Sequence, residues 1–489
     1  MSNVRTEPWV FWENPIPAIR KKDESKGRKV FQDQVKELEA ELDDFSPEVR
    51  KSALEKLTAL EIPPGDPVDN VNLHTHTFFS YNAYNWSPSR FAWESRKAGL
   101  YAAGIIDFDG VDGVTEFLMA SEALSLRATA GIEIRGFLKE FADFEIDSPG
   151  EPGVHYMAGA GFVKMPRKGT PEEAYLQFLK RKSETRSRDM VDRINAAVPD
   201  IAIDFDDVLR TRTPGGYATE RHFVSAYIAK IKERFSAPGQ APAYLSGLLA
   251  IPGDAASALW GNLPSLEEKI RGKLMKRGGY GYVQPGPETF PPVGEVYAWV
   301  KACGAVPMDS WLDGTSAGES RARELLECNR SLGARALNVI PDRNWNVKDP
   351  ADRQRKLENL KKIIELAGEF HMPIHIGTEG NKIGLPFVDD LGGADLNPYK
   401  SVFVSGARVL IGHAVLARFA DFSYAGDRAD AEFAADTKAR NRFFEAAGEL
   451  PPVNAPVGAE LREMGPDKAL EIVRESAKRG KWTGLRSSL

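Results

Sequence analysis

Two histidines separated by one residue are the clearest candidates for chemistry in this sequence. His74 and His76 follow the apolar run VNL, and residues i and i+2 of a β-strand point to the same face. Two neutral imidazoles on one face can hold a divalent cation, and the carboxyl ends of strands form the active-site face of α/β barrels. Two ligands make an incomplete site, so the pair alone leaves metal binding open.

Carboxylates follow two further apolar runs. Asp107 ends the run in GIIDFDGVDG, and Glu133 ends the run in GIEIRG, with Arg135 on the same face as Glu133. Its position at a strand end makes a functional role for Asp107 about as well founded as a structural role in the loop, whereas Asp112 better fits a helix cap. The spacing of Asp107, Asp109 and Asp112 does not match a calcium-binding EF-hand loop.

Short apolar runs that alternate with amphipathic stretches must position these residues. A helix is predicted over 352–370, where Leu357, Leu360, Ile364 and Ala367 line one face. Buried strands alternating with helices indicate a parallel β/α architecture, and about seven such strands favour closure into a barrel. The runs are VNLHT, LYAAGIID, ATAGIEI, GVHYMAG, GAVPMD, ALNVI and PIHIG.

The expected barrel is interrupted by one insertion and flanked by two extensions. The insertion is helical at first and then rich in proline and glycine, so it could cover the barrel mouth. The expected segments are an N-terminal helical extension (1–66), the two barrel halves (67–164 and 301–420), the insertion (165–300) and a C-terminal helical extension (421–489).

Composition and charge restrict the class of protein. Of the 489 residues, 42% are hydrophobic and 27% are charged, which is typical of a folded chain with a sizeable core. The net charge of −6 argues against nucleic acid as the main partner. The two cysteines, Cys303 and Cys328, are too few for a disulfide framework or a cysteine-rich zinc site. Any metal must therefore be held by histidines and carboxylates.

Targeting and membrane features are not apparent in the sequence. The start, MSNVRTEPWVFWENP, has no apolar core of signal-peptide type, and prolines interrupt the longest uncharged stretch, residues 236–253. We therefore expect a cytoplasmic protein that acts on a small molecule, with neither a membrane nor a nucleic acid as partner. Formation of a homo-oligomer is left open.

Four motifs together resemble a known family. HTHTFFS, GIIDFDG, GIEIRG and GVHYMAG have the order and spacing of the polymerase and histidinol phosphatase (PHP) superfamily of metal-dependent hydrolases. RSRDMVDRINAAVPDIAIDFDDVLR is similar to the helical insertion of its phosphoesterase branch. ACGAVPMDSW and HIGTEGNKIG stand where that family has Ala-His-Pro and Gly-Ser-Asp-Ala-His. The resemblance covers residues 71–390 and implies an α/β fold, a distorted (β/α)7-type PHP barrel.

The resemblance also implies a site for one or two divalent ions, such as zinc, manganese or iron. The family's missing Ala-His-Pro histidine has Asp309 as its nearest substitute, or Trp311 in another alignment. The implied ligands are His74, His76, Glu133 and Glu379 for one ion, with Glu133 bridging to a second ion held by His155.

Three family ligands are replaced in this chain. Tyr81, Phe108 and Asn381 stand at positions that hold one of the three metals in trinuclear members. A phenylalanine ring offers no lone pair, and tyrosine is a poor substitute for a carboxylate in a hard-cation site. We therefore expect fewer than three metals.

Basic residues near the predicted mouth are candidates for contact with an anionic substrate. Arg135, Arg221 and Lys382 could neutralise its charge, although each is equally explained as a surface charge. His222 follows Arg221 and resembles an Arg-His neighbourhood of the family, which implies substrate contact. A half-buried helix histidine explains His222 equally well.

The other histidines have structural or catalytic interpretations. His371 fits the C-terminal end of the helix over 352–370, and His375, within PIHIG, fits a core histidine. His413 ends the apolar run in LIGHAV, which resembles a strand end at the mouth. We expect His413 to act as a replacement ligand or as an acid or base.

A cation held by these groups suits ester hydrolysis, because it can activate water and polarise a phosphoryl or carbonyl oxygen. If Glu133 bridges two metals, the water between them is the expected nucleophile, and with one metal Asp107 is the nearest candidate base. The sequence thus predicts a metal-dependent hydrolase, with phosphoesterase action on a small anionic metabolite favoured. A metal-dependent sugar or sugar-acid isomerase, epimerase or lyase, or a non-catalytic scaffold, remains an alternative.

Overall fold

A single seven-stranded sheet forms the centre of the protein. The computed structural model describes residues 24–488, so the N-terminal segment used to judge a signal peptide lies outside the described residues. The strands follow one another across the sheet in chain order. They are β1 (Val68–Thr75), β2 (Leu100–Phe108), β3 (Arg127–Phe137), β4 (Val154–Ala160), β5 (Val306–Trp311), β6 (Ala336–Val339) and β7 (Ile374–Ile376).

The sheet curves into a nearly closed barrel. Neighbouring strands are parallel, except that β4 runs antiparallel to both β3 and β5. Glu379, just beyond β7, bridges to Thr75 at the end of β1. The backbone N–H of His76 donates to the Glu379 carbonyl, and that of Glu379 donates to the His74 carbonyl, each at 2.8 Å. These contacts confirm the expected distorted α/β barrel.

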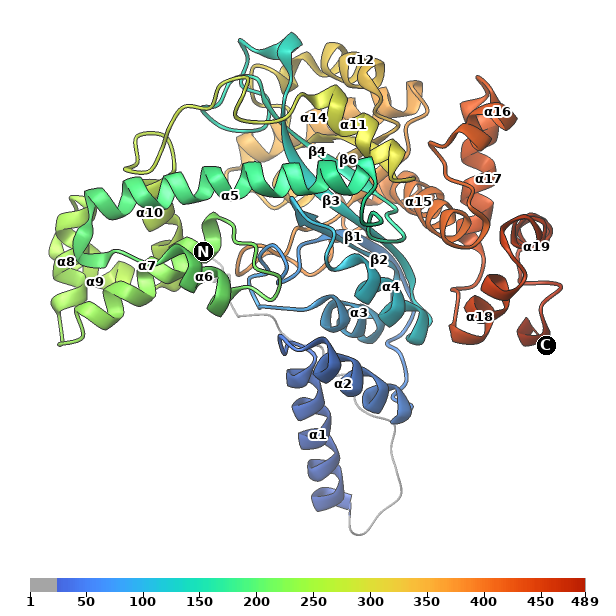
Figure 1. Cartoon of the computed structure of the whole chain (residues 1–489), viewed down its shortest axis with the longest axis horizontal. Coiled ribbons are helices and arrows are strands. Elements are labelled where there is room, and N and C mark those ends of the chain that lie inside the picture. Colours follow the sequence, from blue (N-terminus) through green and yellow to red (C-terminus); the bar gives the residue numbers. More distant parts are fainter. Residues whose placement is uncertain (1–23, 489) are drawn as a thin grey trace.

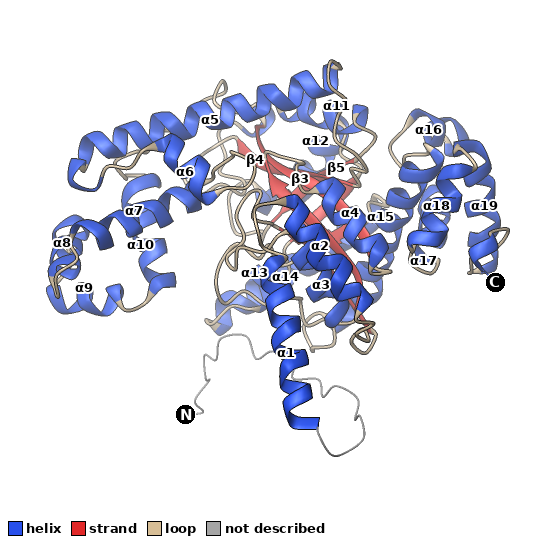
Figure 2. Cartoon of the chain, turned by 60° about the horizontal axis from the view of Figure 1, so that its bottom comes forward, coloured by secondary structure: helices blue, strands red, loops and turns tan. Residues whose placement is uncertain are grey.

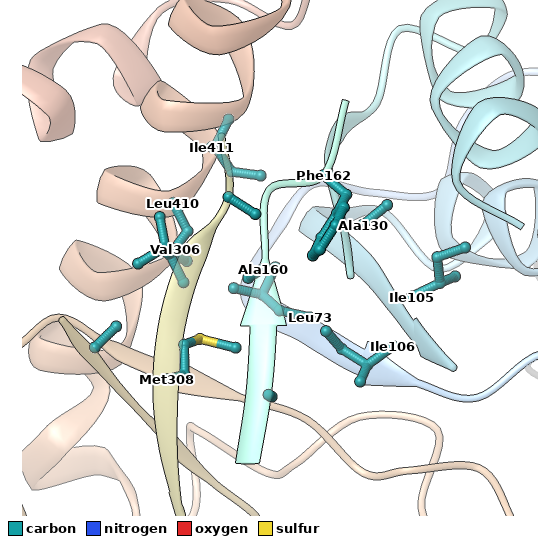
Figure 3. Close-up of a cluster of buried hydrophobic side chains, with 14 of the residues drawn as sticks. Leu73, Ile105, Ile106, Ala130, Ala160, Phe162, Val306, Met308, Leu410 and Ile411 are labelled. Atoms are coloured by element: carbon teal, nitrogen blue, oxygen red, sulfur yellow. The ribbon is translucent and has the colours of Figure 1, made fainter. Parts of the chain in front are cut away.

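Helices cover the outside of this sheet (Figure 1). Helix α14 begins where Asp349 accepts a hydrogen bond from the Asp352 N–H at 2.8 Å, and its Leu360 and Ala367 are buried. Figure 3 shows part of the core, where side chains such as Leu73 and Met308 lie among those of the strands and α15. The covering helices are α3 (Pro88–Lys97), α4 (Val114–Ala123), α11 (Val293–Ala302), α12 (Ala322–Leu332) and α14 (Pro350–Glu369).

A helical insertion between β4 and β5 has a hydrophobic core of its own. Buried side chains of this second core include Ile194, Tyr227 and Ile270. The insertion extends from the barrel on the side opposite the C-terminal helices (Figure 2). Its helices are α5 (Pro171–Ala197), α6 (Phe205–Arg212), α7 (Glu220–Arg234), α8 (Gln240–Leu249), α9 (Gly253–Trp260) and α10 (Leu263–Met275).

Helices also precede and follow the barrel. Ser46 opens α2 by accepting a hydrogen bond from the Val49 N–H, and Pro47 occupies its first turn, as the sequence predicts. Pairs of these helices pack together, α1 with α2 and α17 with α19. They are α1 (Glu24–Glu41) and α2 (Pro47–Ala59) before β1, and α15 (Lys400–Ala420), α16 (Asp427–Phe433), α17 (Thr437–Glu449), α18 (Ala455–Glu463) and α19 (Pro466–Arg479) after β7.

The apolar run around His413 forms helix α15, so the expectation of a strand end there was wrong. Residues 397–420 are long and apolar enough to cross a membrane, with a mean hydropathy of 1.5, but 61% of that window is buried inside the protein. The helix packs against β7 on one side and against α17 and α19 on the other. Because it is buried on several sides, its sequence lacks the polar face that marks an amphipathic helix.

Candidate metal centre

The carboxyl ends of β1 and β3 bring together the three residues with the strongest metal-ligand character. The Nε2 atoms of His76 and His74 lie 3.5 Å and 3.8 Å from Oε2 of Glu133. One donor atom from each residue lies within 4.8 Å of the other two. The side chains of all three are buried. Period-two alternation in the two strands therefore places these donors on one interior face, as the sequence predicts.

The donor atoms of this cluster form no hydrogen bonds in the part of the chain that the structure describes. Nε2 of His74, both ring nitrogens of His76 and Oε2 of Glu133 are buried without a hydrogen bond. Buried polar atoms without partners are costly, and a divalent cation would satisfy imidazole and carboxylate donors together. Burial lowers the pKa of His76 to about 3, which keeps its ring neutral and leaves one ring nitrogen with a lone pair for a metal. The residues present therefore fit a divalent metal.

Asn338 orients His74 from inside the barrel. Its Oδ1 lies 3.0 Å from Nδ1 of His74 and 2.9 Å from Nδ1 of His375, while its Nδ2 donates to Oγ of Ser310 at 3.1 Å. Because Oδ1 can only accept, each Nδ1 must carry the hydrogen, and Nε2 of His74 is left as an acceptor facing Glu133. We did not identify Asn338 from the sequence. The available signal was a polar residue within the apolar run ALNVI.

Glu379, an implied ligand, lies beside this cluster and is paired with an arginine. Nη2 of Arg343 is 3.1 Å and 2.9 Å from the two carboxylate oxygens of Glu379. Burial opposes the negative charge, but Arg343, His76 and His74 lower the pKa of Glu379. The backbone of Glu379 has φ +62°, a left-handed conformation that is uncommon outside glycine. We did not identify Arg343 from the sequence, where nothing separates it from an ordinary surface charge.

Asp107, the candidate base, points to the face opposite Glu133. Phe108 pairs with Glu133 across β2 and β3, so the preceding residue, Asp107, faces the other way. Its carboxylate accepts hydrogen bonds from the N–H of Thr77 at 2.7 Å, from Oγ1 of Thr77 at 2.8 Å and from Oγ of Ser80 at 2.6 Å. Burial nevertheless raises its pKa to about 6. Through these hydrogen bonds, Asp107 stabilises the loop after β1.

Phe108 and Tyr81 occupy positions where the PHP resemblance implies lost ligands. The Phe108 ring stacks on His76, with centroids 4.2 Å apart and planes inclined by 19°. The Tyr81 ring meets His222 edge to face at 5.2 Å. Asn381 is half-buried in the loop beyond Glu379. Both aromatic rings therefore pack against histidines.

His155 and Asp309 are paired with each other, away from the three-residue cluster. His155 is opposite Gly136 in the β3–β4 register, whereas Glu133 is opposite Ala158, so the two side chains lie on different faces. Nε2 of His155 is 2.9 Å from Asp309, and its Nδ1 is 2.9 Å from Asp147. Burial opposes a charge on His155, but the two aspartates outweigh it and raise its pKa to about 10.

This arrangement differs from the expected second metal site. Met157 pairs with Asp309, and Trp311 lies two residues further along β5 on the same outward face. Met157 also pairs with Ile134, which lies on the opposite face of β3 from Glu133. Asp309 and Trp311 therefore point away from the cluster with His74. The structure therefore does not bring His155 or Asp309 together with the other implied ligands.

The predicted substrate-binding residues lie on both the barrel and the insertion. Arg135 follows Glu133 on the inner face, stands over the Phe290 ring at 4.6 Å and is 3.6 Å from Glu151. Arg221, in α7, forms an ion pair with Glu268 at 2.7 Å. The structure does not place either arginine in hydrogen-bond contact with a member of the His74 cluster.

His222 and Lys382 differ in exposure. Nδ1 of His222 accepts a hydrogen bond from the Thr219 N–H at 3.1 Å and so caps α7. Burial lowers the pKa of His222 to about 3, so the ring is a neutral cap. Lys382 is exposed in the loop beyond Glu379. His222 thus contacts Thr219 as part of the cap of α7.

His413 lies at the opposite end of the barrel from the cluster. Its Nε2 is 3.1 Å from the Gly161 carbonyl, and its Nδ1 accepts a hydrogen bond from the Tyr424 N–H at 3.0 Å. Gly161 follows Ala160, which pairs with Val306 at the start of β5, and the mouth is at the other end of β5. His413 is therefore a buried helix residue that joins two loops, and it cannot replace a ligand at the mouth.

Comparisons with known proteins give a distant structural likeness. No protein-family model matches the chain, and no curated protein matches it. An amidohydrolase from Chromobacterium violaceum, solved with sulfate and without metal, has 14% identity and a TM-score of 0.45, covering 69% of this chain and 96% of its own. A candidate metal-dependent phosphoesterase from Bifidobacterium adolescentis has 20% identity and a TM-score of 0.41, covering 66% and 94%. Such low identities and TM-scores establish neither a family nor a function.

Proposed function

We propose that the protein is a metal-dependent hydrolase that cleaves a small anionic phosphoester. The observation that carries this proposal is the group of buried, unpartnered donor atoms on His74, His76 and Glu133. Their chemistry matches zinc, manganese or iron, and the strand ends on which they lie form the active-site face of α/β barrels. The PHP-like order of the motifs supports the same chemistry.

Each residue of the cluster has a defined task in this proposal. His74 and His76 would bind the metal through Nε2, and Glu133 would bind it through Oε2. Asn338 holds His74 in the required tautomer, at 3.0 Å. When bound, the metal supplies activation of water and polarisation of the phosphoryl oxygen. In the overall reaction water attacks phosphorus, the ester P–O bond breaks, and the released alcohol takes up a proton.

The preference for a small substrate rests on the surroundings of the cluster. The ligand residues are almost fully buried, with exposed fractions of 0% for both histidines and 5% for Glu133. Arg135, on the same inner face as Glu133, supplies a positive charge near them, whereas the net charge of −6 does not favour a polyanion. A cytoplasmic small-molecule enzyme without a nucleic-acid or membrane partner fits these features.

A substrate panel tests the proposal. Phosphorylated metabolites should be assayed beside their unphosphorylated sugars and sugar acids, with added manganese, zinc or magnesium. We expect phosphate release that is lost in His76→Ala and retained in His371→Asn, a control substitution at a histidine at the end of α14. Turnover of only unphosphorylated sugars or sugar acids would instead show an isomerase, epimerase or lyase. An active His76→Ala variant would remove the metal cluster from the mechanism.

A further inference from the structure

Arg343 stands at the mouth of the barrel, directly after a strand that builds the metal centre. It lies in the short helix α13 (Asp342–Trp345), which follows β6, and β6 carries the Asn338 that orients His74. Its side chain is 42% exposed, whereas that of Glu379, its partner, is 10% exposed. Arg343 therefore contacts the nearly buried Glu379 and is itself exposed to solvent.

Most of the hydrogen-bonding capacity of Arg343 is unused. Glu379 takes only Nη2, through both of its oxygens. Among residues 24–488, no hydrogen bond is formed by Nη1 or Nε of Arg343. A guanidinium offers five N–H donors in a planar fork that matches the oxygens of phosphate or carboxylate. Nε–H points to the side of Nη2, so the free N–H groups of Nη1 are the ones available for an oxyanion oxygen on the other side of the guanidinium.

The charge of Arg343 acts on the whole cluster. It lowers the pKa of Glu379 and contributes to the lowered pKa of His76, and it also interacts with Glu133. A bound divalent cation would add two positive charges to that of Arg343, beside the carboxyl groups of Glu133, Glu379 and Asp342. The metal and Arg343 would therefore both attract an incoming anion.

Other arginines near the mouth do not have this combination of contacts. Arg135 is stacked over Phe290 and lies near Glu151, and Arg221 is paired with Glu268 in the insertion. Arg343 is hydrogen-bonded to Glu379, whose backbone is in turn bonded to both ends of the His74–His76 segment. An anion bound by Arg343 would consequently have a fixed position relative to the two histidines.

We propose that Arg343 binds an oxygen of the substrate oxyanion at the metal centre through Nη1, while Nη2 stays on Glu379. The ligand class is a tetrahedral phosphate group with at least two free oxygens. This inference rests on the proposed function for its catalytic meaning, but phosphate binding itself can be measured without turnover. The competing role for Arg343 is only to neutralise Glu379, and that role requires no contact with phosphate.

Calorimetric titration of inorganic phosphate into the manganese-loaded protein separates the two roles. The variants are Arg343→Met, which removes the charge, and Arg343→Lys, which keeps the charge without the planar fork. Arg323→Met is the matched control, because Arg323 forms an exposed pair with Glu369 at 2.6 Å on the outer helices. Bound manganese is measured by elemental analysis in every sample.

We expect phosphate affinity to fall by about tenfold or more in Arg343→Met, to fall less in Arg343→Lys, and to be unchanged in Arg323→Met. Manganese content should stay at the wild-type value in all three variants. An unchanged phosphate affinity in Arg343→Met, or no phosphate binding by the wild-type protein, would overturn the inference. Loss of manganese from Arg343→Met would show that Arg343 acts only on Glu379, and it would also overturn the inference.

Failure of the proposed function would look different. If the wild-type protein hydrolyses no phosphoester but its phosphate affinity still depends on Arg343, the anion site stands and the hydrolase proposal fails. If phosphoesters are hydrolysed equally well by wild type and Arg343→Met, the hydrolase stands and this inference fails.

Discussion

Asn338 and His74 are joined by a hydrogen bond of 3.0 Å between Oδ1 and Nδ1, buried inside the barrel. In this orientation the Nδ2 of Asn338 donates to Oγ of Ser310 at 3.1 Å. The bond therefore fixes the tautomer of His74 and aims its Nε2 at Glu133. Residues that orient a metal ligand in this way commonly change metal affinity when they are replaced.

Replacing Asn338 with leucine should weaken metal binding without unfolding the barrel. We expect the affinity for zinc or manganese to fall by about 10- to 100-fold, since His74 loses its tautomer control. Competition with a chelator measures this affinity, and circular dichroism checks the fold. Asn195→Leu, which removes comparable hydrogen bonds inside the insertion, should leave the affinity unchanged. Equal affinities for wild type and Asn338→Leu would show that Asn338 does not orient the ligand.

Metal removal should destabilise the protein through the same cluster. A metal present at 100 times its dissociation constant adds about 2.7 kcal/mol to the free energy of unfolding. Thermal denaturation with and without a chelator should show this gain in wild type and in His371→Asn, and should show none in His76→Ala. His371 has φ +54°, which asparagine tolerates, so that control is expected to fold. A metal-dependent gain in His76→Ala would contradict the assigned ligands.

Elemental analysis should find fewer than three metal ions per chain. Phe108 stacks on His76 where the PHP resemblance implies a ligand, and it provides no lone pair. The nitrogens of His155 are both paired with aspartates. Three equivalents bound at the mouth would mean that the motifs are misaligned.

Replacing Asp107 with asparagine should lower stability more than it lowers metal binding. The change puts an amide N–H₂ where a carboxylate oxygen now accepts hydrogen bonds from Thr77 or Ser80. The free energy of unfolding should fall by about 1–3 kcal/mol, measured by urea denaturation, with metal content retained. A large loss of kcat at unchanged stability would instead restore Asp107 as a general base.

The sequence was sufficient for the barrel and for the central ligands because both depend on local periodicity. Alternating apolar runs identified the strands, and the spacing of His74 and His76 placed them on one face. The positions of His155 and Asp309 depend on the antiparallel β4 and its register, and a shift of one residue reverses the face. Arg343 and Asn338 acquire their roles only through contacts between β6, β1 and the segment after β7, which no local pattern records.

His155 should contribute pH-dependent stability from outside the metal centre. Its folded pKa of about 10 lies above the usual value of 6.5, since Asp147 and Asp309 outweigh the effect of burial. A raised folded pKa means that this contribution is complete below about pH 6.5 and is lost as the pH rises toward 10. His155→Leu would leave two buried carboxylates without their cation, at a cost of about 3–5 kcal/mol near neutral pH. Urea denaturation between pH 6 and 9.5 should therefore show a decline in wild type that is much smaller in His155→Leu. Parallel declines in the two proteins would show that the imidazolium does not stabilise the fold.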